Sequence, residues 1–579
     1  MYTDVLLRTR IFLFAVALSF LFLILGLFHA QIIQGQYYSQ RSEQNRIVVI
    51  PLEAPRGRLV DRNGKVIVDN RISFDVSVIY KDAGDFGKLV TLLSDVLDMD
   101  SKKLLAIMEK AKWRPYAPTL LAEDIGKKNA IILEQLRVDY PGLVISTKPR
   151  REYVYGRSAA SITGYLNKIS EDELTRFKTY GFTADDLIGR SGLEKQYDNY
   201  LRGAEGGMQV EIDSVGRQKR ILQVKYPETG NSVRLTVDIR LQQFCYEVMD
   251  DKHGAIIVMN PINGEIYSLM SKPSFDPNIF VNKGMNKEIN RILVDREKEY
   301  PLLNRCISCG YPPGSIFKIV VGAAALETGS VSKDVQYACP GYLDFGGRRF
   351  KCWREEGHGV QYLGDALKNS CNVFFYKLGL RTGVDNISDY AAMFGLGTCT
   401  GIDLPGEIAG VRPSKKWKRA VIKESWYKGD TVNYSIGQGY LLVTPIQLIR
   451  VTAAVANGGF VVRPYLAEQV GFVKVASSSL EKINVSQETL HIIKEGLIRV
   501  VNDKHATGMK ARLNEVVVAG KTGTAQNPKG GTHGWFSGFA PAEKPSICVL
   551  AFVEDGRGGL EASGIARSVM KKCIEIGLM

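Results

Sequence analysis

YPPGSIFKIVVGAAALETG, residues 311–329, is the stretch that decides the fold predicted for the second half of the chain. Two prolines and Gly314 mark the start of a helix, and Gly329 marks its end. The residues between them, Ile319 to Leu326, are apolar on nearly every face. This pattern predicts a helix that is buried inside a domain and does not lie on its surface.

Ser315 and Lys318 lie in the first turn of this predicted helix, three residues apart on one face. Backbone N–H groups and the positive end of the helix dipole favour negative charge on a serine at this position. Burial lowers the pKa of a lysine, so the Lys318 amine can take the serine proton. The pair is a weak motif by itself, because a helix cap followed by a surface lysine gives the same spacing.

A second motif, Ser370-Cys371-Asn372, precedes an aromatic segment, Val373 to Leu378, that is expected to be helical. In an acyl-transfer site Ser370 can relay a proton to a leaving amine. Asn372 can hold the amide of the substrate.

A third motif, KTGT at residues 521–524, is expected to end a strand over Glu515 to Ala519. Gly523 would let a substrate backbone approach the strand edge, where the Thr524 N–H would join that of Ser315 as an oxyanion hole. The residues expected to bind a terminal carboxylate are Lys521, Thr522 and Thr524. The order Ser-x-x-Lys, Ser-x-Asn, Lys-Thr-Gly is the signature of serine β-lactamases and penicillin-binding proteins.

The strands predicted for the second half fall at its two ends, with helical segments between them. They are Ala255 to Asn260, Glu265 to Ser271, Glu515 to Ala519, Trp535 to Phe539 and Ile547 to Val553. This order predicts an α+β domain with one five-stranded antiparallel sheet flanked by helices. A final helix over Ile565 to Ile576 is expected to cover the sheet.

Beyond these motifs, the sequence resembles the class B penicillin-binding proteins over essentially its whole length. The segments that carry the resemblance are 54–57 (APRG), 61–64 (DRNG), 192–194 (GLE) with Tyr197, 437–439 (GQG) and 444–445 (TP). The resemblance implies an N-terminal transmembrane helix, an elongated α+β pedestal domain at residues 34–235 and a transpeptidase domain at residues 236–579. It implies a serine D,D-transpeptidase that cross-links peptidoglycan stem peptides through a Ser315 acyl-enzyme and is inhibited by β-lactams, with no cofactor needed for the chemistry.

Cys352-Trp353 and 357–359 (GHG) resemble the elongation-type members of this family. That resemblance implies a role in cell elongation and cell shape, with a polytopic glycosyltransferase and other elongation-complex proteins as partners. The sequence shows no second catalytic domain for glycan polymerisation, so polymerase activity is expected from a partner.

Residues 11–33 run for 23 positions without Lys, Arg, Asp or Glu. As a helix they would reach about 34 Å, enough to cross a bilayer core of about 30 Å. We expect a single-pass anchor in the cytoplasmic membrane that follows a short cytoplasmic tail, residues 1–10, and not a cleaved signal peptide. A polar helix is expected next, over Tyr37 to Arg46. Basic residues flank both ends of the anchor, so its flanking charges do not indicate its orientation. The expectation that the catalytic domain is extracytoplasmic therefore depends on the expected function.

The composition sets 75 Lys and Arg against 61 Asp and Glu, a formal charge of +14. Such an excess suits contact with anionic lipid or an acidic polymer. No Lys/Arg-rich block or aromatic-basic repeat accompanies it, so we expect no nucleic-acid partner.

Three cysteines and one histidine, within 33 positions, form a candidate metal site: Cys339, Cys352, His358 and Cys371. Three thiolates and one imidazole make a closed tetrahedral set, which is typical of structural zinc. Cys371 is the middle residue of the Ser370-Cys371-Asn372 motif, so a metal would brace that motif. The resemblance to elongation-type members points to the same place, with aspartates in the positions of Cys339 and Cys352. A Cys339–Cys352 disulfide and buried free thiols remain alternatives.

Other functions use the same three motifs. A class A β-lactamase needs a glutamate to activate the deacylating water, and none stands in its expected setting between Asn372 and Lys521. A D,D-carboxypeptidase and a division-type transpeptidase share all three motifs. A non-catalytic subunit of a wall-building complex is disfavoured, because Ser315, Lys318 and Lys521 are all present.

Overall fold

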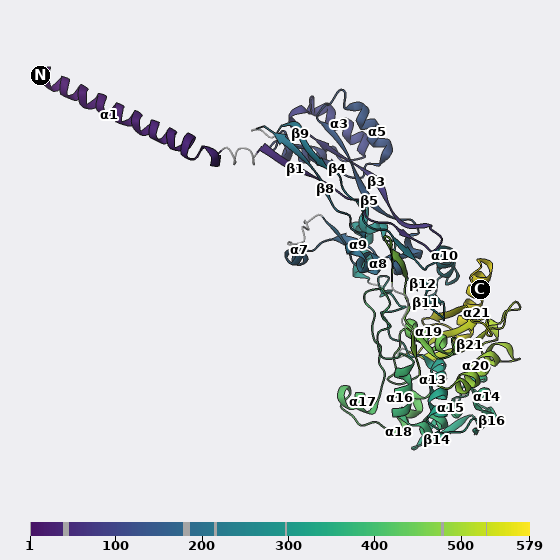
Figure 1. Ribbon diagram of the computed structural model, residues 1–579. Coiled ribbons are helices and arrows are strands. Elements are labelled where there is room, and N and C mark those ends of the chain that lie inside the picture. Colours follow the sequence, from purple (N-terminus) through teal and green to yellow (C-terminus); the bar gives the residue numbers. More distant parts are fainter. Residues whose placement is uncertain are drawn as a thin grey trace. The chain divides into compact units, whose positions relative to one another are not determined.

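The computed structural model describes residues 2–38, 46–177, 186–213, 217–295, 298–475, 480–527 and 530–579 (Figure 1). Contacts divide the chain into two compact units. The first comprises Met1–Pro55, Ile72–Arg150 and Gly203–Thr229, and the second comprises Arg56–Arg71, Arg151–Arg202 and Gly230–Met579. The boundaries predicted at residues 34–235 and 236–579 stay a prediction. Three segments assigned there to the pedestal, residues 56–71, 151–202 and 230–235, belong by their contacts to the second unit.

The first unit begins with α1 (Tyr2–Phe28), which continues as the π-helical turn His29–Ile33. Its span Asp4–Ile33 has a mean hydropathy of 2.9 in its most apolar window and is exposed along that window. The helix is therefore long and apolar enough to cross a membrane, and it contains the predicted anchor. Of the polar helix expected over 37–46, residues 39–45 lie outside the described part of the chain.

The rest of the first unit is a small α+β structure. Its outer sheet pairs, in order, β1 (Ile47–Leu52), β8 (Gly206–Ile212) and β9 (Gln218–Lys225). Its other strands are β4 (Thr119–Ala122) and parts of β3 (Val66–Val78) and β5 (Leu143–Tyr153). One apolar core joins them to α3 (Phe86–Leu97), α4 (Ser101–Ala111) and α5 (Gly126–Leu136).

The second unit is built on a five-stranded antiparallel sheet in the order β12-β11-β23-β22-β21 (Figure 1). The strands are β11 (Gly254–Met259), β12 (Ile266–Lys272), β21 (Ala519–Gln526), β22 (Thr532–Ala540) and β23 (Ile547–Val553). Because β11 pairs with β23, the sheet joins the two ends of the unit. The predicted α+β class and five-stranded sheet are confirmed.

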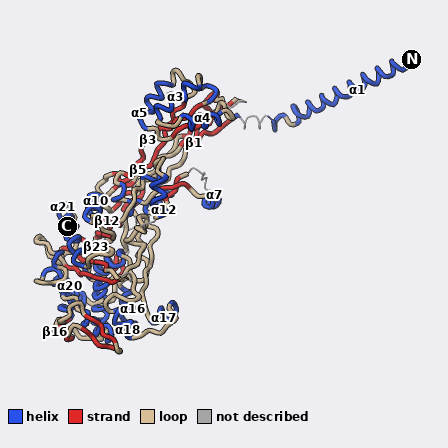
Figure 2. The backbone as a smooth tube through the Cα atoms, turned by 180° about the vertical axis from the view of Figure 1, so that it is seen from behind, coloured by secondary structure: helices blue, strands red, loops and turns tan. Residues whose placement is uncertain are grey.

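Helices cover both faces of this sheet, so β11 and β23 are buried along their whole length (Figure 2). On one face α10 (Ile239–Val248) and α21 (Gly559–Glu575) share a core with Ile256 and Val258. On the other face α19 (Pro445–Ala456) packs against β11, β22 and β23. β21 lies at the edge of this sheet and is paired on one side, with β22.

The strand predicted at Glu515 to Ala519 is wrong in its position. The observed strand β21 begins at Ala519 and contains all of residues 521–524, which pair in register with β22 from Ser537 to Gly534. Lys and Gly are depleted in strands although Thr is enriched there, so the run Lys-Thr-Gly-Thr predicts no strand by itself, and pairing with β22 supplies the missing stabilisation. The third motif therefore lies inside an edge strand and does not follow one.

Candidate active site

Ser315 lies in a tight turn that packs against the edge strand β21. The turn is a 3-10 helix, Gly314–Phe317, and the α-helix α13 begins at Lys318 and ends at Glu327. The predicted placement of Ser315 in the first turn of the α-helix is therefore wrong by one turn. Gly314 has a φ of 55°, and a Cβ there would lie 2.8 Å from the Thr524 carbonyl oxygen. Glycine is required at this position because the turn approaches β21 so closely.

Lys318 is fully buried and connects the first motif to the second. Its Nζ donates to the Ser370 carbonyl at 2.8 Å and to Asn372 Oδ1 at 2.8 Å, and it lies 3.3 Å from Ser370 Oγ. Ser315 is partly exposed, and in the described structure no hydrogen bond joins its hydroxyl to Lys318. Since the amide oxygen of Asn372 is occupied, its NH₂ group remains as the donor for a substrate.

Lys521, from the third motif, contacts the hydroxyl of Ser370. Its Nζ donates to Ser370 Oγ at 3.0 Å and to the Thr522 carbonyl at 3.1 Å, and the side chain is fully buried. The hydroxyl of Ser370 therefore lies between two buried amines, one from α13 and one from β21. The structure thus brings together the residues of all three predicted motifs.

Burial of the two amines changes their acid–base behaviour. Burial lowers the pKa of Lys318 to about 8, although the nearby thiols of Cys371 and Cys352 act in the opposite direction. The pKa of Lys521 is lowered well below its ordinary value by burial and then by the charge of Lys318. Two amines that share one hydroxyl disfavour double protonation, so one of them can serve as a proton acceptor.

Successive side chains of β21 point to opposite faces of the sheet. A Cβ on Gly523 would lie 3.0 Å from the Pro313 carbonyl, so this position faces the serine turn. Thr522 and Thr524 point the other way, towards the start of α21, where Thr524 Oγ1 accepts from the Gly559 N–H at 3.2 Å. Thr524 is exposed at the strand edge, whereas Thr522 is buried. Of the three residues expected to contact a carboxylate, Lys521 is fully buried, Thr522 is buried beside Gly559, and Thr524 is exposed.

Ser370 has a φ of 51°, a left-handed backbone conformation that is strained for a residue other than glycine. It follows α14 (Leu363–Lys368) and precedes α15 (Asn372–Thr382). The preceding residue is held from two sides: Trp353 Nε1 donates to the Asn369 carbonyl at 2.9 Å, and Asn369 Nδ2 donates to Gln361 Oε1 at 2.7 Å. Gln361 in turn donates to the His358 carbonyl at 2.8 Å. Sequence spacing gave no sign of this chain of hydrogen bonds.

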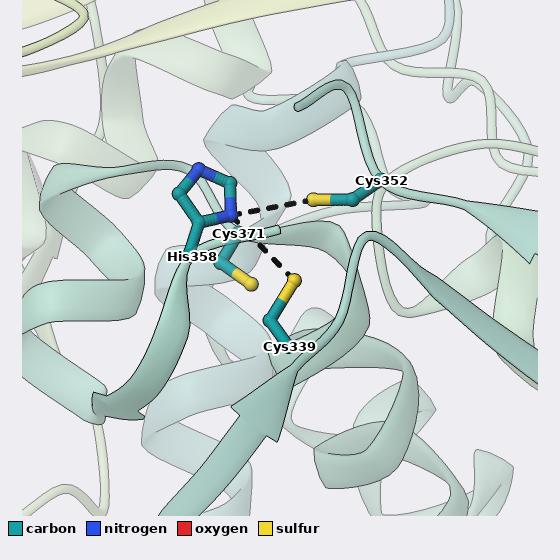
Figure 3. A group of neighbouring side chains, drawn as sticks. All are labelled: Cys339, Cys352, His358 and Cys371. Carbon is teal, nitrogen blue, oxygen red and sulfur yellow. Dashed lines mark hydrogen bonds between the residues drawn. The ribbon is translucent and has the colours of Figure 1, made fainter. Parts of the chain in front are cut away.

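The four predicted metal ligands lie together beside this chain (Figure 3). Their donor atoms all lie within 4.8 Å of one another, and His358 Nδ1 is 3.5 Å from Cys352 Sγ and 3.6 Å from Cys339 Sγ. Cys371 caps α15 and accepts from the Phe374 N–H at 3.5 Å. The pKa of Cys352 is lowered, chiefly by its hydrogen bond with the neighbouring Cys371 thiol, and the pKa of Cys371 is raised by the same contact. The two sulfurs therefore share one proton.

The segment around these ligands contains two small antiparallel pairs, β13 (Gln336–Cys339) with β16 (Gly359–Tyr362) and β14 (Tyr342–Phe345) with β15 (Arg348–Lys351). The paired strands hold Cys339 opposite Gly359, next to His358.

Two family models match this chain. A family described as penicillin binding protein transpeptidase domain matches residues 254–575, and one described as penicillin-binding protein dimerisation domain matches residues 51–235. The chain belongs to the penicillin-binding proteins. The resemblance drawn from the motifs is confirmed.

This penicillin-binding protein is 33% identical to the peptidoglycan D,D-transpeptidase MrdA of Acinetobacter baumannii, over 97% of this chain and 87% of the relative. It is 29% identical to MrdA of Escherichia coli, over 95% and 91%. Among solved structures, the Helicobacter pylori penicillin-binding protein PBP2 in complex with MreC has a TM-score of 0.81 at 27% identity and covers 92% of this chain and 99% of that one. A chain of a peptidoglycan synthase complex has a TM-score of 0.74 at 29% identity, over 98% and 97%.

Proposed function

We propose that this penicillin-binding protein is a peptidoglycan D,D-transpeptidase that cross-links stem peptides during cell-wall elongation. The observation that carries the proposal is the hydroxyl of Ser370, which lies between the buried amines of Lys318 and Lys521. The elongation role is supported by the MrdA relatives and by the likeness to the PBP2 structure.

The geometry supports an acyl transfer in two steps. In the first, Ser315 Oγ attacks the carbonyl carbon between the two terminal D-alanines, and its proton passes to the neutral amine of Lys318. The carbon–nitrogen bond then breaks, and the leaving D-alanine amine takes a proton relayed through Ser370. In the second step, an amine of another stem attacks the ester, gives up a proton and restores the Ser315 hydroxyl. Lys521 and Thr524 bind the terminal carboxylate, and the N–H groups of Ser315 and Thr524 stabilise the oxyanion.

The test is a cross-linking assay with the full-length protein, a polytopic glycosyltransferase and lipid-linked precursor. We expect cross-linked dimers of stem peptides that disappear when penicillin is added. Release of D-alanine without dimers would identify a carboxypeptidase instead. Retention of cross-linking in Ser370→Ala at more than about a tenth of the normal rate would exclude the proposed proton relay.

We further propose that Cys339, Cys352, His358 and Cys371 hold a structural zinc ion. The donor set fits, since three sulfurs and an imidazole nitrogen converge within 4.8 Å. His358 Nδ1 is the ring nitrogen that faces the sulfurs of Cys339 and Cys352, and Nε2 is buried with no hydrogen-bond partner among the described residues. Four protein ligands leave no open position for substrate, so the ion would hold the segment before Ser370 and take no part in the acyl transfer.

Metal analysis of the purified protein tests this site. We expect about one zinc per chain, lost in Cys352→Ser, with the thiols of Cys339 and Cys371 then open to alkylation. Less than a tenth of a zinc per chain in protein that binds penicillin, or a mapped Cys339–Cys352 disulfide, would contradict it.

We also propose that α1 anchors the protein in the cytoplasmic membrane, with the catalytic unit outside, and that it works beside a polytopic glycosyltransferase and other elongation proteins. The apolar helix supports the anchor. The structures of PBP2 with MreC and of a peptidoglycan synthase complex support such partners. Co-purification of the glycosyltransferase with the full chain, and its loss when α1 is exchanged for an unrelated membrane helix, would test the assembly.

A further inference from the structure

A basic hollow of about 710 Å³ lies between α21 and the 3-10 turn Met509–Ala511. Four exposed cations line it: Lys510 from the turn, Arg512 directly after the turn, and Arg567 and Lys571 from the helix. Its helical wall between the cations is made of the small residues Gly564 and Ser568. The hollow thus combines concave shape with positive charge on every side.

The cations are carried by well-packed elements. Ala511, Leu513, Val569 and Met570 are buried in one apolar core, which fixes the turn against the helix. Arg567 Nε donates to the Arg512 carbonyl at 3.0 Å. This bond uses one donor of Arg567 and leaves its terminal NH₂ groups for another partner.

Neighbouring cations are paired, whereas these four are not. On α21 Lys572 pairs with Glu575 at 3.0 Å, and just before the turn Asp503 pairs with Lys368 at 3.1 Å and with Arg499 at 3.3 Å. None of the four lining cations makes an ion pair with a described residue. Arg567 and Lys571 are moreover four positions apart on one helix, a spacing at which like charges repel.

One carboxylate, Glu515, lies close to this group. Its pKa is lowered by hydrogen bonds with the backbone around Asn514 and further by the charges of Lys571 and Arg567. Four cations against one carboxylate leave a net positive charge, and an anionic ligand would relieve the repulsion.

The shape and the side chains limit the ligand class. A bilayer presents a flat charged surface, which fits poorly into a hollow. No aromatic side chain lines it, so it offers no platform for stacking nucleobases or sugar rings. Two arginines suit bidentate contacts with carboxylates.

We propose that this hollow binds carboxylate-bearing stem peptides of a peptidoglycan strand, separately from the stem that occupies the catalytic site. The inference rests on the proposed function, since that function supplies the polymer. α21 packs on β21, the strand that carries Lys521, so the hollow and the catalytic motif are supported by the same sheet. A strand held here would keep its uncross-linked stems near the enzyme between turnovers.

The experiment measures binding of soluble uncross-linked peptidoglycan strands to full-length protein whose catalytic serine is already acylated with penicillin. The variant carries Lys510→Gln with Lys571→Gln, and the matched control carries Lys416→Gln with Lys544→Gln, two exposed lysines elsewhere on the same unit. We expect the affinity for the strands to fall about tenfold in the first variant, because each exposed charge contact is weak and two are lost. In the control the affinity should stay within about twofold. Rising salt should abolish the difference.

Acylation by penicillin, measured first, reports separately on the proposed function and on folding. If the double variant labels poorly, Lys571→Gln alone provides the comparison. Equal affinity of variant and control would overturn the proposal. So would equal binding of strands whose stem carboxylates have been amidated, or tighter binding of vesicles of anionic phospholipid than of strands.

Discussion

At the scale of single residues, the chemistry depends on which of two buried amines is neutral. Burial lowers the pKa of Lys318 to about 8, from the 10.5 of an ordinary lysine. The neutral form is the base, so its fraction grows as pH rises through this value.

We therefore predict that the rate of acylation by penicillin rises about tenfold per pH unit below pH 8 and levels off above it. Stopped-flow or gel-based labelling between pH 6 and 10 measures this profile. A flat profile, or a rise centred near pH 10, would show that the amine of Lys318 is not the base.

Lys318→Arg keeps the positive charge and removes the neutral form, because a guanidinium stays protonated at these pH values. The larger head group must also fit a fully buried site. We expect acylation to fall by at least about 100-fold, with no recovery at high pH. A rate within a few-fold of the wild type would make Lys318 an electrostatic helper.

At the scale of elements, the small strands before Ser370 position that residue. Gln361 lies on β16, is 5% exposed, and bridges His358 and Asn369 through hydrogen bonds of 2.8 and 2.7 Å. Leucine at this position would leave these polar groups without partners at a cost of about 1–3 kcal/mol.

We predict that Gln361→Leu slows acylation about tenfold while penicillin still reacts at Ser315, because the strained Ser370 backbone loses its support. The matched control is Gln242→Leu, a fully buried amide on α10 that bonds to Ser158 and Leu269 far along the sheet. It should lower the melting temperature by a similar amount without changing the rate per folded molecule. Equal slowing in both variants would mean that the effect is general destabilisation.

Some features of these elements could be predicted from the sequence and others could not. The three motifs could be found from the sequence because each is a short pattern whose chemistry is local. The four metal-ligand candidates could be found because their residue types suit zinc and fall within 33 positions. The position of β21 could not, since Lys521 to Thr524 become a strand only through pairing with β22. The positioning role of Gln361 and Asn369 could not be predicted for a similar reason. Gln361 lies on β16, which forms by pairing with β13 far back in the chain, and no periodicity in the sequence indicates that pairing.

At the scale of the whole molecule, a buried ionic cluster joins distant parts of the second unit. Glu194 is fully buried and accepts from Arg151 Nε at 2.7 Å and from Arg56 at 3.0 Å. Burial raises the pKa of its carboxyl, but the two guanidinium groups outweigh this and lower the pKa overall. The stabilisation is therefore present above the ordinary glutamate pKa and is lost as pH falls through the lower folded value.

Glu194→Gln removes the counter-charge of the buried Arg151, whereas Arg56 keeps its pair with Asp198 at 2.8 Å. Breaking such a buried pair costs roughly 3–5 kcal/mol. We expect a large drop in melting temperature at pH 7, by calorimetry, with a normal acylation rate in the molecules that remain folded. The control Glu488→Gln removes an exposed pair with Lys333 and should change stability by less than about 1 kcal/mol. A Glu194→Gln protein as stable as the control would assign this cluster a role other than stability.

The central claim is that Ser315 is the residue that carries the acyl group. The direct measurement is peptide mapping by mass spectrometry after labelling the full-length protein with penicillin. We expect one adduct, on Ser315, and no labelling of a Ser315→Ala variant whose melting temperature is unchanged. An adduct on any other residue, or undiminished labelling of the folded Ser315→Ala protein, would contradict it.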